Sequence, residues 1–187
     1  MAQWFVIFLF YSFAGYGLEK WFAYVSHSPH QVRKCFLLLP LCPVYGLGMC
    51  ALLAVIPENA GTLPLLALSG GVCTGVEFLV HLFYDRFFQV KFWDYTNALG
   101  NIQGRICPVF SLIWCFLALL MVRFVQPLVE VLAALIPPWA VFLLWVTLAA
   151  DCVLSAALLR KFRNIDALDL GWAAGQMWDF SQSDTSL

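Results

Sequence analysis

Long apolar stretches make up most of this sequence, and only a few charged residues interrupt them. Hydrophobic residues account for 63% of the 187 residues and charged residues for 11%, and the mean hydropathy is +0.84. A soluble domain has no use for so much apolar surface, so we expect a lipid bilayer to be the solvent of most side chains. The sequence therefore predicts an all-α, polytopic transmembrane helix bundle.

Five stretches are long enough to cross the hydrocarbon core, which takes about 20 apolar residues in helical form. They are residues 4–26, 36–57, 63–84, 106–126 and 139–161. A shorter apolar run, from Leu128 to Ile136, lies between Pro127 and the Pro137-Pro138 pair. Because proline interrupts a helix, we interpret this run as an interfacial or re-entrant helix. The alternative is a sixth, broken span in which the run pairs with the stretch that follows it.

The distribution of lysine and arginine predicts the orientation, because short cytoplasmic loops carry an excess of basic residues. Basic residues fall in the first loop, in or beside the third loop, and after the last span: Arg33, Lys34, Arg86, Lys91, Arg105, Arg160, Lys161 and Arg163. Arg123 is the clear exception. We expect a multi-pass protein of the cell membrane with its N-terminus outside and its C-terminus in the cytoplasm. Residues 1–163 would form the membrane domain, and residues 164–187 a short cytoplasmic tail.

The composition gives no sign of a metal site, a cofactor or nucleic-acid binding. The net charge is −1. The seven cysteines lack C-x-x-C spacing and are best interpreted as small core residues. Glu77 and His81 could supply half of a metal site, but no other His or Cys is placed to complete it. We therefore predict no metal and no cofactor.

Polar residues inside the apolar stretches converge at one depth under this topology. Glu19 lies near the cytoplasmic end of the first span, and Glu77, His81 and Asp85 form an i, i+4, i+8 stripe toward the cytoplasmic end of the third. A charged side chain at a helix centre in lipid costs about 2.5–3.5 kcal/mol on insertion scales. Each of these residues therefore needs a partner or a function.

Small residues and prolines suggest how the spans approach one another. Glycines at Gly15–Gly17 and Gly70–Gly75 would let the first and third spans pack closely, which would bring Glu19 toward Glu77. In the second span, Pro40 and Pro43 precede Tyr45. The carbonyls that these prolines free must be covered by protein or line a wet cavity.

The third loop supplies further polar groups on the cytoplasmic side. Arg105 is permanently ionised and is the best candidate counter-charge for the buried carboxylates. The predicted substrate-binding or coupling residues are Glu19, Tyr45, Glu77, His81, Asp94, Asn101 and Arg105. The alternative is a packing network in which the acidic groups and Arg105 only neutralise one another.

Five blocks, in order along the chain, carry a resemblance to a known family. They are Phe10-Tyr11-Ser12 with Gly15 and Glu19, Pro40-Leu41-Cys42-Pro43-Val44-Tyr45-Gly46, Thr74-Gly75-Val76-Glu77-Phe78, Trp93-Asp94-Tyr95-Thr96 with Asn101 and Gly104-Arg105-Ile106-Cys107, and Ser111 with Trp114. From Phe10 to Pro127 the chain resembles the bacterial CmpB-like family of type IV ABC-transporter permeases. It departs from that family's pattern mildly at Tyr16, Asp85 and Cys115, and more strongly at Val32-Arg33-Lys34, before the second span.

The resemblance implies a transport-type membrane protein, namely the permease subunit of an ABC-type transporter. The sequence has no G-x-x-x-x-G-K-[ST] motif, so ATP-driven transport needs a separate ATPase chain. The length suits a half-transporter, so we expect association with a second copy or another membrane subunit. As a membrane protein, the chain would also contact membrane lipids.

Two further hypotheses stay open from the sequence. In one, the chain is a membrane-embedded enzyme acting on a lipid or lipid-linked substrate at the cytoplasmic leaflet. Glu77 or Asp94 would then be the general base, and Arg105 would bind a phosphate. In the other, it is a scaffold without a substrate. We favour transport over catalysis.

Overall fold

The computed structural model describes residues 2–26, 35–57 and 59–169, and this part of the chain is helical, with an isolated bridge between Ile102 and Ile106 as its only β-type pairing. The helices are α1 (Ala2–Val25), α2 (Pro43–Val55), α3 (Thr62–Phe88), α4 (Pro108–Leu120), α5 (Gln126–Leu135) and α6 (Pro138–Phe162). A π-helical turn, η1 (Met121–Val125), joins α4 to α5, and a 3-10 helix, η2 (Ile165–Leu168), follows α6. The predicted all-α class is confirmed.

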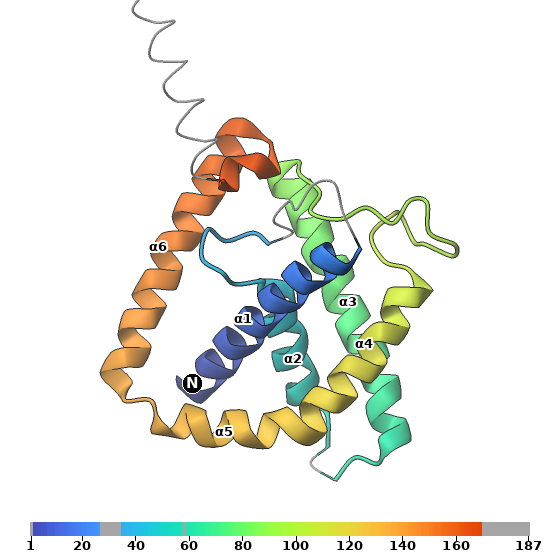
Figure 1. Ribbon diagram of the computed structural model, residues 1–187, viewed down its shortest axis with the longest axis vertical. Coiled ribbons are helices and arrows are strands. Elements are labelled where there is room, and N and C mark those ends of the chain that lie inside the picture. Colours follow the sequence, from blue (N-terminus) through green and yellow to red (C-terminus); the bar gives the residue numbers. More distant parts are fainter. Residues whose placement is uncertain (1, 27–34, 58, 170–187) are drawn as a thin grey trace, which may run out of the picture.

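Successive long helices alternate in direction (Figure 1). α1, α3 and α6 run toward the end of the molecule that carries the loop between α3 and α4, which we call the loop end. α2 and α4 run toward the opposite end, where α5 lies across the molecule and links α4 to α6. We call this the α5 end. The start of α1 and the turn before α3 lie at the α5 end.

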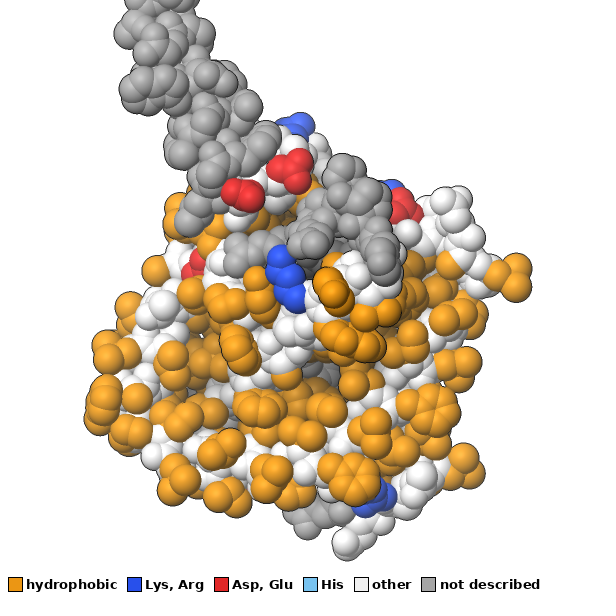
Figure 2. Space-filling model, in the orientation of Figure 1, with side chains coloured by type: hydrophobic (Ala, Val, Ile, Leu, Met, Phe, Trp, Pro, Cys, Tyr) orange, Lys and Arg blue, Asp and Glu red, His pale blue; other side chains and the backbone are white. Residues whose placement is uncertain are grey.

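Apolar side chains cover the face of the molecule shown in Figure 2, and charged side chains gather mainly at the loop end. Large hydrophobic residues stay exposed, among them Phe116 (60%), Phe142 (64%) and Val153 (71%). Within the described residues, three helical segments are long and apolar enough to cross a membrane: α3, the continuous run Pro108–Leu135, and α6. Such a surface is that of a membrane protein.

The predicted second span is only partly helical. α2 has 13 residues and begins at Pro43, so it is about 20 Å long at 1.5 Å per residue. A hydrocarbon core is about 30 Å thick. The span expected over 36–57 is therefore helical only from Pro43, and its first part is irregular, as expected from Pro40 and Pro43, which interrupt the helical hydrogen bonds there.

Side chains of α6 hold the irregular segment that precedes α2. The backbone N–H of Leu38 donates to Ser155 Oγ at 3.2 Å, and that of Leu39 donates to Asp151 Oδ2 at 3.2 Å. Ser155 and Asp151 are both buried. The expectation that protein covers this irregular backbone is confirmed, and Asp151 has a structural role in it.

The short run after Pro127 forms a helix, but the proline does not begin it. α5 starts at Gln126 and continues from α4 through η1 without a break, while the helical path changes direction (Figure 1). Prolines and π-helical turns are both usual causes of such bends. The expected boundary at Pro127 is therefore wrong, whereas the Pro137-Pro138 pair does separate α5 from α6.

The glycines do not form the contact that we expected between the first and third spans. A Cβ at Gly15 would lie 2.3 Å from Tyr45 Cγ of α2, and a Cβ at Gly70 would lie 2.6 Å from Cys115 Sγ of α4. Close packing therefore joins α1 to α2 and α3 to α4. A Cβ would meet nothing within 4 Å at Gly17, Gly71 and Gly75.

Some predictions fall outside the described residues. These are the basic residues Arg33 and Lys34 of the first loop and residues 170–187 of the tail. The first residues of the tail are described: η2 buries Leu168 completely, at 0% exposure, against the core residues of α3 and α6.

Candidate functional site

A cavity of about 310 Å³ lies between α1, α2, α3, α4 and residues 89–107, which we call the 89–107 loop. We name it the Glu77 cavity. Its lining residues are Leu18, Glu19, Trp21, Phe22, Cys42, Val44, Tyr45, Glu77, Trp93, Tyr95, Phe110, Ile113, Trp114 and Leu117. The four helices contribute mainly residues from their loop-end halves, so the cavity lies toward the loop end.

Glu77 is held by two neutral donors on the wall of this cavity. The Tyr95 hydroxyl donates to Glu77 Oε1 at 3.1 Å, and Trp114 Nε1 donates to Glu77 Oε2 at 3.0 Å. The Glu77 residue is 4% exposed. Burial, and then the negative charge of Glu77, raise the pKa of Tyr95 above its usual range, so the phenol stays protonated as a donor.

Glu19 occupies the α1 side of the cavity and has its own phenol partner. The Tyr45 hydroxyl donates to Glu19 Oε1 at 2.8 Å. The Tyr45 ring packs on one face against Gly15 and contacts the Trp114 ring, with a centroid distance of 4.9 Å. Because Trp114 also binds Glu77, the Tyr45–Trp114 ring contact connects the environments of the two carboxylates.

Arg105 does not pair with either carboxylate of the cavity. The described part of the chain contains the ion pairs Lys91–Asp94 at 3.2 Å and Arg105–Asp85 at 2.7 Å. The expected pairing of Arg105 with Glu19 and Glu77 is therefore replaced by one with Asp85. Asp85 lies two turns after Glu77 on α3, which places the guanidinium beyond the cavity.

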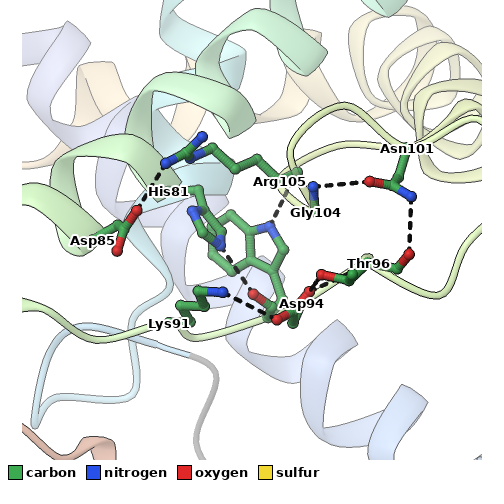
Figure 3. A network of polar contacts seen from close by, with 9 residues as sticks. His81, Asp85, Lys91, Asp94, Thr96, Asn101, Gly104 and Arg105 are labelled. Carbon is green, nitrogen blue, oxygen red and sulfur yellow. Dashed lines mark hydrogen bonds and ion pairs between the residues drawn. The ribbon is translucent and has the colours of Figure 1, made fainter.

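Asp94 belongs to a network within the 89–107 loop (Figure 3). Its Oδ1 accepts hydrogen bonds from the backbone N–H of Thr96, at 2.9 Å, and from the Thr96 hydroxyl, while its Oδ2 accepts one from Lys91 Nζ. These donors, Thr96 above all, lower the pKa of Asp94 to about 2. Asp94 thus stabilises the turn that begins the loop.

Asn101 closes the same network from the other side of the loop (Figure 3). Its Nδ2 donates to the backbone oxygens of Thr96, at 3.0 Å, and Ala98, at 2.9 Å, and its Oδ1 accepts from the N–H of Gly104 at 2.9 Å. Gly104 has φ of +68°, a conformation that glycine adopts without cost. Asn101 therefore serves the conformation of the loop.

His81 and Arg105 fix the position of Trp93, which lines the cavity. His81 Nε2 is hydrogen-bonded to the backbone oxygen of Trp93 at 3.0 Å, and Trp93 Nε1 donates to the backbone oxygen of Arg105 at 3.0 Å. The Arg105 guanidinium donates to Asp85 and to Gln103. Figure 3 shows the Arg105 guanidinium beside Asp85, with His81 close by.

The predicted site residues thus separate into two groups. Glu19, Tyr45 and Glu77 line the cavity, whereas His81, Asp94, Asn101 and Arg105 belong to the loop network that supports it. The sequence reasoning named neither Tyr95 nor Trp114 as a site residue, although both donate to Glu77. Residue type was the signal that could have identified them, because a buried carboxylate needs hydrogen-bond donors and both side chains carry one.

The fold and the cavity together define a helical membrane protein with an acidic cavity near one end. Residues 6–156 match the family model described as "Putative ABC-transporter type IV". The match covers most of the chain, so this protein belongs to that family, and the resemblance noted from the sequence is confirmed. Comparisons with curated proteins and with solved structures give no match.

Proposed function

We propose that this chain is the membrane permease subunit of an ABC-type transporter and that the Glu77 cavity is its substrate site. The observation that carries the proposal is the cavity itself, in which Glu19 and Glu77 converge from different helices onto one space. Membership of an ABC-transporter family supports the transport role. A separate ATPase chain would supply the energy, and a second membrane subunit, either another copy or a different chain, would complete the pathway.

The topology that we propose has five spans, with the N-terminus outside and the C-terminus in the cytoplasm. The spans would be α1, α2 with the irregular segment before it, α3, α4 and α6, and α5 would lie at the interface. The alternating helix directions support this arrangement (Figure 1). Residues 1–163 would then be the membrane domain and 164–187 the cytoplasmic tail.

The positions of the basic residues support the same orientation. Lys91 and Arg105 lie in the 89–107 loop, at the loop end, whereas Arg123 donates to the backbone oxygen of Ala60 at the α5 end. Reporter fusions in the turn before α3 and after Arg163 test the orientation. We expect the first reporter to respond from outside and the second from the cytoplasm, and reporters on the same side would overturn the topology.

The alternative of a lipid-modifying enzyme needs Arg105 to hold a phosphate. Its guanidinium is already hydrogen-bonded to Asp85 and Gln103, and Asp94 is bound to Thr96 and Lys91. Arg105 and Asp94, two of the three groups assigned to that chemistry, are therefore engaged within the loop network. The geometry favours binding in the Glu77 cavity over catalysis at the loop.

Two measurements on the purified protein test the proposal. Native mass spectrometry would identify molecules that the wild-type protein retains, and we expect a retained small molecule to be lost from Glu77→Gln but kept by the control Glu130→Gln. Glu130 is exposed and lies at the α5 end of the molecule.

Affinity purification from native membranes should also recover an ATPase chain. Equal retention by both variants would overturn the site, and the repeated absence of an ATPase would overturn the ABC role.

A further inference from the structure

Among the residues that the structure describes, no basic side chain lines the Glu77 cavity beside its two carboxyl groups. Glu19 and Glu77 receive hydrogen bonds from two phenols and one indole, all neutral. The N-terminal ends of α2 and α4 lie at the cavity and contribute about half a positive charge each. Two carboxyl groups that share a cavity of low dielectric cannot both ionise readily without a positive partner, so a bound cation would stabilise their ionised forms.

The walls favour an organic cation over a metal ion. No group of three or more His, Cys, Asp or Glu side chains that could hold a metal occurs among the described residues, and hard cations need about six oxygen ligands. Aromatic rings make up much of the lining instead, including a stacked pair, Tyr95 and Phe110, with centroids 4.7 Å apart. Aromatic faces attract ammonium groups through their quadrupole.

The edge of the cavity favours a ligand that also has an apolar part. Trp21 and Ile113 line the cavity and are 61% and 46% exposed on the outer surface of the protein. The face of the molecule shown in Figure 2 is apolar over most of its area. A ligand with a hydrocarbon portion could therefore contact these side chains while its charge lies deeper, near the carboxylates.

We propose that the Glu77 cavity binds an amphipathic organic cation. Its ammonium group would lie between Glu19 and Glu77, and its apolar portion would pack against the aromatic walls. The proposal rests on the proposed function only in taking this cavity as the substrate site. Binding of the ammonium group to paired carboxylates is the property that separates this class from neutral lipids and anions.

The experiment compares two probes of the same shape on the wild-type full chain in lipid nanodiscs. Benzyltrimethylammonium is a cation, and neopentylbenzene is its neutral isostere, with carbon in place of nitrogen. Equilibrium binding is measured with radiolabelled probes, and partition into empty nanodiscs is subtracted. We expect at least tenfold tighter binding of the cation. Equal binding of the two probes, or no binding of the cation, would overturn the proposal, and neither result depends on a variant folding correctly.

Matched variants locate the binding. Glu77→Gln should weaken binding of the cation at least tenfold, whereas Glu130→Gln should leave it unchanged because Glu130 lines the separate cavity at the α5 end. If Glu77→Gln does not fold, binding of the cation by Glu19→Gln tests the same site. Cation binding that survives both cavity variants would place the site elsewhere and overturn the proposal.

The failure of this inference and that of the proposed function are distinguishable. A neutral or anionic molecule that the wild-type protein retains, and that Glu77→Gln loses, would overturn the cation class while the cavity stays the substrate site. Retention that does not depend on Glu77 at all would overturn the site and the inference together.

Discussion

The Glu77 cavity and the 89–107 loop are neighbouring regions that are both rich in polar groups, but their contacts are built in different ways. In the loop, Asp94 binds Thr96 and Asn101 binds Gly104, partners only two and three residues away. In the cavity, Glu77 is bound by Trp114, which is 37 residues away. The loop network is formed mainly within the loop, with Arg105 reaching Asp85 of α3, whereas the cavity is assembled from distant segments and holds two carboxyl groups with no basic side chain among its described lining residues.

This difference indicates a different role for each region. A network formed mainly within one loop stabilises a backbone conformation, and here that conformation presents Trp93 and Tyr95 to the cavity. Carboxylates that meet from separate helices without a cation are costly to assemble for packing alone. We therefore treat the loop as the support and the cavity as the site, and the following variants test that division.

The largest effect is expected where the cavity wall is packed most tightly. Gly15→Ala would place a Cβ 2.3 Å from Tyr45 Cγ and 2.6 Å from Tyr45 Cβ, so rotation of the ring cannot relieve the clash. We expect a loss of about 3 kcal/mol in unfolding free energy, measured by SDS-induced unfolding in mixed micelles, together with loss of ligand binding. Gly17→Ala is the matched control, because a Cβ there meets nothing within 4 Å. Equal stability of the two variants would contradict the close contact.

The next effect should arise in the loop. Gly104→Ala would force a left-handed conformation on alanine, at about 1–2 kcal/mol, and would place a Cβ 2.6 Å from Thr96 Oγ1. We expect a loss of about 2 kcal/mol in unfolding free energy and weaker binding, because Trp93 and Tyr95 shift with the loop. Gly61→Ala, where the nearest atom is 3.7 Å away, serves as the control. Binding that stays unchanged in Gly104→Ala would separate the loop from the cavity.

Breaking the ion pair between Arg105 and Asp85 should have a smaller effect on stability. The sequence had suggested Glu77 as the partner of Arg105 instead. A double-mutant cycle of Arg105→Gln with Asp85→Asn should give a coupling energy of about 1 kcal/mol or less, since the Asp85 side chain is 37% exposed. The cycle of Arg105→Gln with Glu77→Gln should give a coupling near zero, because these residues share no hydrogen bond. A larger coupling in the second cycle would restore the neutralising network considered from the sequence.

These contrasts show what the sequence could and could not predict. The all-helical fold, the irregular backbone near Pro40 and the common depth of Glu19 and Glu77 followed from residue type and spacing, although the glycine contact expected to bring these two residues together did not form. Those features depend on local chemistry and on the cost of polar groups in lipid, which a sequence displays directly.

Partner choice over long distances could not be predicted in the same way. Which carboxylate Arg105 reaches depends on the rotation of α3 and on the path of the loop. Its partner Asp85 lies about one helical turn after His81 on the same face of α3. The extent of α2 depended likewise on Ser155 and Asp151 of α6, which stabilise the non-helical segment before it. Such contacts are set by tertiary packing rather than by periodicity.

The smallest effect is expected for Asp94→Asn. The asparagine Oδ1 can still accept hydrogen bonds from the Thr96 N–H and hydroxyl, and the lost ion pair joins side chains that are 52% and 46% exposed, so the cost at neutral pH should stay below about 1 kcal/mol. Because the pKa of Asp94 is lowered to about 2 in the folded protein, its carboxylate stabilises the fold above its ordinary pKa. That contribution is lost as the pH falls from about 4 toward 2. Thermal unfolding of wild type and variant should therefore differ slightly at pH 7 and converge near pH 2. A loss of ligand binding in Asp94→Asn with normal stability would move Asp94 from the support into the site.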